Sequence, residues 1–97
     1  MTLYNNVVNP CKGEKAELWI DNGDSPKKIH VVVYNMLGIK IKDFAPKVFQ
    51  EGLVEVIDYW DCKTDDGKII DTGLYYFVVE REDWKEPKFR KCFIICD

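Results

Sequence analysis

The sequence has little of what several large classes of protein require. It contains one histidine, no run of more than two basic residues, and no apolar stretch near the roughly 20 residues that a membrane-spanning helix needs. Its 14 basic and 17 acidic residues give a formal net charge of −3. Nucleic-acid binding requires a clustered basic face, so we expect neither a nucleic-acid surface nor a membrane span.

The N-terminal residues also lack the pattern of a secretory signal peptide. Met1 to Tyr4 leads directly into two asparagines, with neither a basic segment nor an apolar core segment. We therefore expect either a cytoplasmic protein or a piece of a longer precursor, and composition alone leaves both open. The length of 97 residues predicts one folded domain over residues 1–97, since such a chain can build a single core.

Cysteine is present, but not at the spacings that metal sites use. The four cysteines, Cys11, Cys62, Cys92 and Cys96, include no Cys-x-x-Cys pair, and His30 has no cysteine or acid at ligand spacing. On one extended strand Cys92 and Cys96 would lie roughly 13 Å apart, too far for a disulfide. We expect no metal and no cofactor, with His30 on the solvent side of a strand.

The clearest positive signal is an alternation of apolar and polar residues with a period of two. Residues 29–34 and 89–95 show it well, and turn signals such as Asn22-Gly23 and Asp66-Gly67 separate the alternating segments. No window carries a helical stripe. The pattern predicts an all-β sandwich or barrel of about seven strands, near residues 5–9, 14–20, 28–35, 39–44, 53–60, 73–82 and 88–96.

The segment from Asp61 to Gly67, with the sequence DCKTDDG, is the best candidate for a metal loop. A calcium loop of the EF-hand type needs oxygen ligands at positions 1, 3 and 5 and glycine at position 6. Counted from Asp61, position 3 is Lys63 and position 6 is Asp66, so the pattern fails. An irregular calcium site is the alternative.

A structural interpretation of this acidic region is favoured over catalysis. Asp61 suits an Asx-turn, and Gly67 suits a positive φ after two aspartates. Asp71 to Gly73 predicts a second turn, immediately before the strand near residues 73–82. The sequence shows no pattern that pairs a nucleophile with a general base. We therefore expect that the chain is not an enzyme and has no catalytic residues.

The order of these motifs resembles the FlgD-like immunoglobulin domain over about residues 5–96. The resemblance rests on five elements in sequence: Asn9-Pro10, Tyr34-Asn35 with Gly38, Trp60-Asp61, Gly67, and Gly73-Leu74-Tyr75. This family occurs in the flagellar hook-capping protein and as a C-terminal module of secreted and surface proteins, including substrates of the type IX (Por) secretion system. The resemblance implies an immunoglobulin-like sandwich.

The resemblance also implies a function. We expect a non-catalytic C-terminal accessory module of a larger secreted or cell-surface bacterial protein, serving export, surface attachment or domain packing. Its partners would be the upstream domains of the parent chain or the export and attachment machinery. The alternatives are a carbohydrate- or protein-binding module and the immunoglobulin-like part of a flagellar hook-capping scaffold.

Two positions depart from the family pattern. Cys62 stands where the family usually has glycine, and a positive φ there would strain a cysteine. Asp58 falls on the face where the alternation expects an apolar side chain. A bulge near Ile57 and Asp58 would resolve the second departure.

Four aromatic residues carry specific expectations. Trp60 and Tyr75 are expected to be core anchors, as large aromatics in sandwiches usually are. Trp19 is out of phase with its apolar neighbours, so we expect it to be half-exposed. Trp19 and Trp84 are candidates for a sugar or protein platform, whereas the alternative for Trp84 is a ring covered by lysine stems.

The first and last strands are expected to run side by side in parallel, as is frequent in sandwiches of this kind. Cys11 and Cys96 end those strands and are therefore the candidate disulfide, with four reduced cysteines as the alternative. The final strand, with its charged residues beside Phe89 and Phe93, is the candidate sheet edge for docking.

Overall fold

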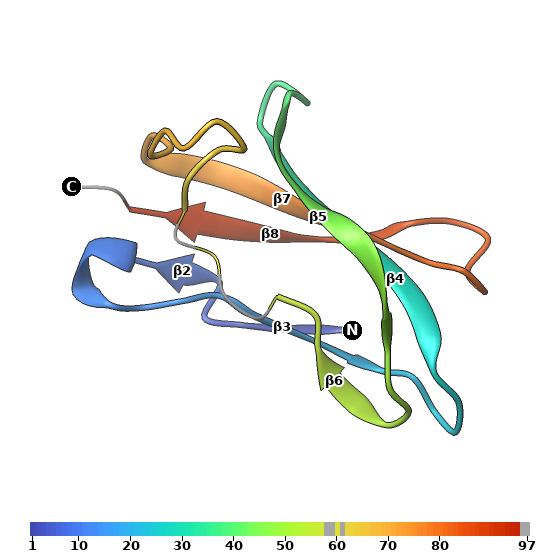
Figure 1. Cartoon of the computed structure of the whole chain (residues 1–97). Helices are drawn as coiled ribbons and strands as arrows, with labels where there is room; N and C mark the ends of the chain where they lie inside the picture. The colour runs from blue at the N-terminus through green and yellow to red at the C-terminus, as the bar shows by residue number, and fades with distance from the viewer. Residues whose placement is uncertain (58–59, 61, 96–97) are drawn as a thin grey trace.

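A computed structural model of the chain describes residues 1–57, 60 and 62–95. Their strands form two facing sheets with the core between them, which confirms the expected immunoglobulin-like sandwich (Figure 1). One short 3-10 helix, η1 (Pro10–Lys12), is the only helical element in the described part of the chain.

The two sheets differ in size. The smaller has three strands, all antiparallel, in the order β1 (Thr2–Tyr4), β3 (Glu17–Asp21) and β6 (Leu53–Glu55). The larger has five, in the order β2 (Val7–Val8), β8 (Lys88–Ile94), β7 (Gly73–Arg81), β4 (Lys27–Asn35) and β5 (Lys40–Phe49).

The N-terminal segment contributes one strand to each sheet. β1 pairs with β3, and the chain then turns at Asn5, which has a φ of 57°. Asparagine tolerates this left-handed conformation better than most residues. β2 then runs parallel to β8, with Val8 opposite Ile94. This confirms the expected parallel pairing of the strand predicted near residues 5–9 with the final strand.

The largest differences from the sequence-based prediction are in β1, β5 and β6. β1 was not predicted. β5 continues to Phe49 through Pro46, because β5 is an edge strand and Pro46 falls at the register shift between the Ile29–Lys47 and Val31–Phe44 pairs, where it has no ladder partner. β6 ends at Glu55 instead of residue 60, and the predicted bulge at Asp58 lies outside the described residues.

The core is built from the inward residues of both sheets and confirms the two expected aromatic anchors. Trp60 is buried and makes edge-to-face contacts with Phe44 and Phe77, at centroid distances of 6.2 and 5.9 Å. Its indole N–H donates to the Lys63 carbonyl at 2.9 Å. Tyr75 is also buried, and its hydroxyl donates to the Asp71 carbonyl at 2.7 Å. Both polar groups are thereby satisfied, as buried aromatics require.

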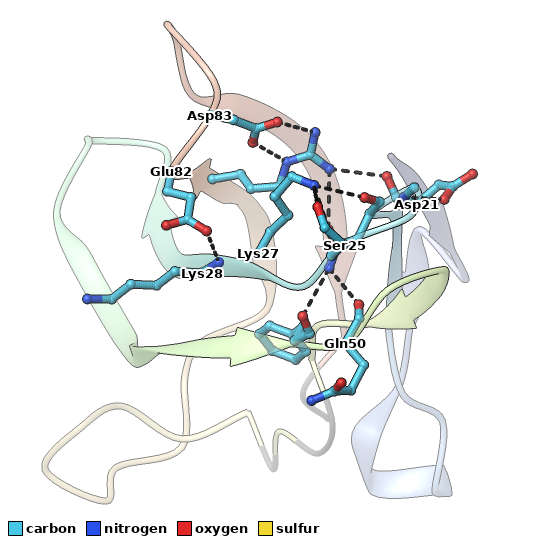
Figure 2. A network of polar contacts seen from close by, with 11 residues as sticks. Asp21, Ser25, Lys27, Lys28, Gln50, Glu82 and Asp83 are labelled. Carbon is cyan, nitrogen blue, oxygen red and sulfur yellow. Dashed lines mark hydrogen bonds and ion pairs between the residues drawn. The ribbon is translucent and has the colours of Figure 1, made fainter.

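A buried polar network connects several segments by hydrogen bonds at one end of the sandwich (Figure 2). Asn22, 3% exposed, donates its side-chain amide to the Gln50 carbonyl at 2.9 Å and to that of Phe49 at 3.4 Å. Arg81 of β7 donates to the Asn22 side chain and to the Asp21 carbonyl, at 3.3 and 3.1 Å. This Asn22–Arg81 network ties the β3–β4 and β5–β6 connections to the larger sheet.

Candidate interaction surface

The larger sheet turns an apolar side toward solvent. Ile29, Val31 and Val33 of β4 point into the core and are buried. The alternate residues point outward, and the ladders place Val32 opposite Val78 and Tyr34 opposite Tyr76. We call this surface the outer apolar face; it comprises Val7, Val32, Tyr34, Leu74, Tyr76, Val78, Phe89 and Phe93.

Aromatic rings dominate this face: Phe89 and Phe93 are exposed and Tyr34 and Tyr76 are half-buried, whereas Val32 is 8% exposed. Phe89 is 55% exposed, and its ring meets that of Tyr76 edge-to-face at 6.0 Å. A hollow of about 370 Å³ lies between Tyr34, Tyr76, Phe89 and Met36. Exposed apolar residues that gather in one patch, in contrast to ones scattered singly, are a frequent feature of interaction sites.

The β4–β5 hairpin extends this surface with an exposed apolar tip. We call residues Asn35 to Ile39 the hairpin tip; Met36 is 69% and Leu37 83% exposed. A second hollow, of about 160 Å³, lies between these two residues and Leu74 of β7. Water-facing turn positions are usually polar, so two large apolar side chains here are unusual.

The backbone of the hairpin tip is fully organised without help from those side chains. The Asn35 side chain accepts from the N–H groups of Leu37 and Ile39, at 2.9 and 3.0 Å. Asn35 and Ile39 also pair through the backbone at 3.0 Å, and Gly38 has the positive φ expected of it, 78°. The backbone hydrogen bonds of the tip therefore involve neither the Met36 nor the Leu37 side chain.

A polar groove of about 420 Å³ lies at the opposite end of the sheet. Its walls include His30, Glu80 and Trp84. His30 is half-buried, and its Nε2 lies 2.6 Å from an Asp43 carboxylate oxygen. This hydrogen bond lowers the pKa of Asp43 below its ordinary value. The pair could not be predicted from sequence spacing, because a bulge between Ile29 and Val31 shifts the β5 register.

The two candidate platform tryptophans lie in different surroundings. Trp84 is half-buried, with the Arg81 guanidinium 4.7 Å and the Lys88 ammonium 4.4 Å from its ring centroid. The ring is therefore covered by basic side chains, as in the structural interpretation of this residue. Trp19 is half-buried on the outer side of β3 and shares a hollow of about 350 Å³ with Tyr4, Glu17 and Leu53. A platform role remains a prediction for both.

The acidic loop acts as a turn and as an edge cap. Gly67 has the predicted positive φ, 86°. The Asp65 carboxylate accepts from the Asp43 N–H at 3.2 Å and pairs with the Lys42 ammonium at 3.2 Å. The Asp65 N–H donates to the Ile41 carbonyl, so this loop covers part of the β5 edge. Asp61 lies outside the described residues.

The final strand is not the sheet edge that its position in the chain predicted. β8 lies between β2 and β7, so its C-terminal half is paired on both sides. Its N-terminal half extends beyond β2, where the Arg90 guanidinium donates to the carbonyls of Phe89 and Met1, both at 2.8 Å. Arg90 thereby occupies an edge acceptor, which hinders the addition of another strand.

The cysteines occupy three kinds of environment. Cys92 is buried, and burial raises the pKa of its thiol to about 11. Cys62 is buried with a φ of 58°, the strained conformation expected where the family pattern has glycine. Cys11 is exposed next to β2, and Cys96 lies outside the described residues. The Cys11–Cys96 disulfide therefore remains a prediction.

No cluster of three metal-ligating side chains is found among the described residues, and no helix among them is long and apolar enough to span a membrane. The acidic side chains with the clearest partners pair with bases on the chain itself. Asp83, for example, accepts from Arg81 at 2.6 and 3.0 Å, which lowers the pKa of its carboxyl.

The strand order and the divided N-terminal segment define an immunoglobulin-like β-sandwich. Neither a scan against protein-family models nor a search of curated proteins found a match. Among solved structures, the chain is similar to part of the crystal structure of dimeric latent PorU from Porphyromonas gingivalis. The TM-score is 0.74 at 19% sequence identity, over 99% of this chain and 9% of the PorU chain. The similarity shows the fold, and it places that fold within a much longer chain in PorU.

Proposed function

We propose that the chain is a non-catalytic, C-terminal immunoglobulin-like module of a larger secreted or cell-surface bacterial protein. In this proposal it serves type IX (Por) secretion, as a signal for export, a surface attachment or a packing domain. One observation carries the proposal. The fold is similar over nearly the whole chain to a 9% portion of PorU, a protein of that system.

The outer apolar face supports a docking role for such a module. Together with the hairpin tip, it offers aromatic and methionine side chains, the residue types that protein interfaces favour. The backbone beneath is held by strand pairing and by the hydrogen bonds of the tip, so binding would order few backbone groups and lose little conformational entropy. This face, and not the β8 edge, is the proposed contact with a neighbouring domain or the export machinery.

A fusion experiment tests the export role. The whole chain is placed behind a reporter protein that carries its own signal peptide, and the fusion is produced in Porphyromonas gingivalis. We expect the reporter to reach the cell surface or medium only when the chain is attached. The matched control is the same fusion with Trp60→Ala, whose unfolded module should leave the reporter in the periplasm. Equal surface reporter with and without the chain would contradict the proposal.

A metal-removal experiment tests the proposed structural role of the acidic loop. Asp65 already holds a lysine and a backbone N–H, so we expect no calcium requirement. Neither EDTA nor millimolar calcium should shift the melting temperature by more than about 1 °C, because a ligand of the folded state raises stability by mass action. A calcium-dependent rise in melting temperature would show that the loop is a metal site.

A second candidate function rests on Trp19. Its ring, Tyr4 and the Glu17 carboxylate line one hollow, and sugars bind through aromatic stacking together with carboxylate acceptors. Titration of the chain with soluble oligosaccharides should then quench tryptophan fluorescence, and Trp19→Ala should abolish the response while Trp84→Ala retains it. The same response in Trp19→Ala would exclude this candidate.

A further inference from the structure

One basic residue stands alone within the outer apolar face. Lys91 lies on β8 between Phe89 and Phe93, which point to the same side, and directly opposite Tyr76 of β7. The diagonal neighbours on β7 are Leu74 and Val78. Every same-face neighbour on these strands is therefore apolar or aromatic, and the exposed Lys91 ammonium has no carboxylate partner in the described part of the chain.

Two lysines of the edge strand β5 have a different situation. Lys40 pairs with Asp43 at 3.5 Å, and Lys42 pairs with Asp65 at 3.2 Å. The position of Lys91 thus leaves a single positive charge at the centre of a surface that is otherwise suited to burial.

Covering the face would remove water from Lys91 as well as from the rings. An ammonium that loses its water without gaining an acceptor is costly to bury, and the cost is offset only by a well-placed opposite charge with hydrogen bonds. A partner that buries Phe89 and Phe93 must therefore bring a carboxylate to the position above Lys91.

We propose that the outer apolar face binds a protein segment in which apolar side chains surround one aspartate or glutamate, and that this carboxylate pairs with Lys91. The inference rests on the proposed docking function and adds the chemistry of the partner. The apolar side chains occupy the hollow beside Tyr34 and Met36, and the carboxylate sets the register.

Two other occupants fit the surface less well. A second copy of the chain would oppose Lys91 to the outer apolar face, whose eight residues include no acid. The strands carry two acids on the same side of the sheet: Asp43, opposite Val32, already pairs with His30 and Lys40, and Glu80 lies opposite His30 at the polar groove. An anionic membrane attracts clusters of several basic residues, whereas this face has Lys91 alone and the adjoining Lys40 is paired with Asp43. A segment whose apolar side chains surround one carboxylate would cover the rings and also pair with the Lys91 ammonium.

A peptide titration of the 97-residue chain, followed by NMR, tests the inference. The probes are two capped pentapeptides, Leu-Phe-Glu-Phe-Leu and the same peptide with glutamine in place of glutamate. We expect the glutamate peptide to perturb signals of Tyr34, Tyr76 and Phe89 and to bind about fivefold more tightly than the glutamine peptide. Lys91→Met keeps the apolar stem and should remove this preference. Lys85→Met, in the exposed β7–β8 loop, is the matched control and should retain it.

Each remaining outcome overturns the inference. Equal affinity of wild type for both peptides, perturbations elsewhere on the surface, or no binding at millimolar peptide would exclude the carboxylate partner. Sedimentation that shows a dimer dissociated by Phe89→Ser would assign the face to a second copy. Binding to phosphatidylglycerol vesicles that is lost in Lys91→Met would assign it to a membrane. Because the titration involves no export, failure of the reporter fusion alone would reject the secretion role and leave the peptide result standing.

Discussion

At both ends of the larger sheet an asparagine side chain hydrogen-bonds to backbone groups, but only one end exposes large apolar side chains to solvent. At one end, Asn22 and Arg81 hydrogen-bond to the β3–β4 and β5–β6 connections (Figure 2). At the other end, Asn35 caps its own turn, and Met36 and Leu37 point away from the core. The hairpin tip and these connections lie at opposite extremes of β4 (Figure 1).

This difference separates stability from binding. Buried polar groups that bond to several segments contribute to the folded state, because any one loss leaves unsatisfied partners. Exposed apolar groups on an already organised turn contribute little to folding, so their presence requires another reason. We infer that the network end holds the sandwich together and that the hairpin tip is available for docking.

The largest expected effect comes from Asn22→Ala at the network end. The substitution leaves the carbonyls of Phe49 and Gln50 and one Arg81 donor without their partner. We expect the free energy of unfolding to fall by about 2–4 kcal/mol in urea denaturation. A loss below about 0.5 kcal/mol would mean that water replaces the network without cost and would remove the contrast between the ends.

The same substitution at the tip, Asn35→Ala, should have a smaller effect. Asn35 caps two N–H groups that water can reach in its absence. We expect a loss of about 1 kcal/mol in the same denaturation experiment, typical of a lost local cap. A loss equal to that of Asn22→Ala would show that the two ends stabilise the fold alike.

Replacement of the apolar tip residues should affect stability least among the side-chain deletions. The double variant Met36→Ser, Leu37→Ser removes surface that is mostly exposed in the folded state. We expect its free energy of unfolding to stay within about 0.5 kcal/mol of wild type, as for most surface changes. A matched core variant, Val33→Ser, should lose several times more and calibrates the measurement, since Val33 is fully buried.

The smallest effect is a pH dependence at the network end. Arg81 lowers the pKa of the Asp83 carboxyl in the folded state, so its ionised form stabilises the fold above the ordinary value of 3.8. That contribution is lost as the pH falls through the lower folded-state pKa. Asp83→Asn should therefore lower the melting temperature slightly at about pH 6 and match wild type near pH 2. A difference that persists in acid would assign the effect to something other than this charge.

Much of the fold was predictable because buried strands with clear alternation dominate it. β4 and β7 agree with their predicted ranges to within one residue, and Trp60 and Tyr75 lie in the core as expected. β1 was missed because three residues are too few to show a period. The predicted range 39–44 is too short for β5 because proline usually ends a strand, whereas an edge strand accepts Pro46.

The candidate surface was harder to predict, for a physical reason. In β8 both alternating sets contain apolar and basic residues: Cys92 and Ile94 are buried in one set, whereas Phe89 and Phe93 of the other set face outward. Alternation cannot say which set faces the core when each set contains apolar residues. The His30–Asp43 pair depended on a bulge that changes the register, and sequence spacing carries no signal for it.

The most direct test of the account is the surface display of a reporter fused to the Met36→Ser, Leu37→Ser variant, measured beside the wild-type fusion. We assign these two side chains to docking and not to folding. We therefore expect display to fall strongly while the isolated variant melts within about 4 °C of wild type, as expected for a stability change under about 0.5 kcal/mol. Undiminished display by this variant would contradict the assignment of the hairpin tip as part of the docking surface.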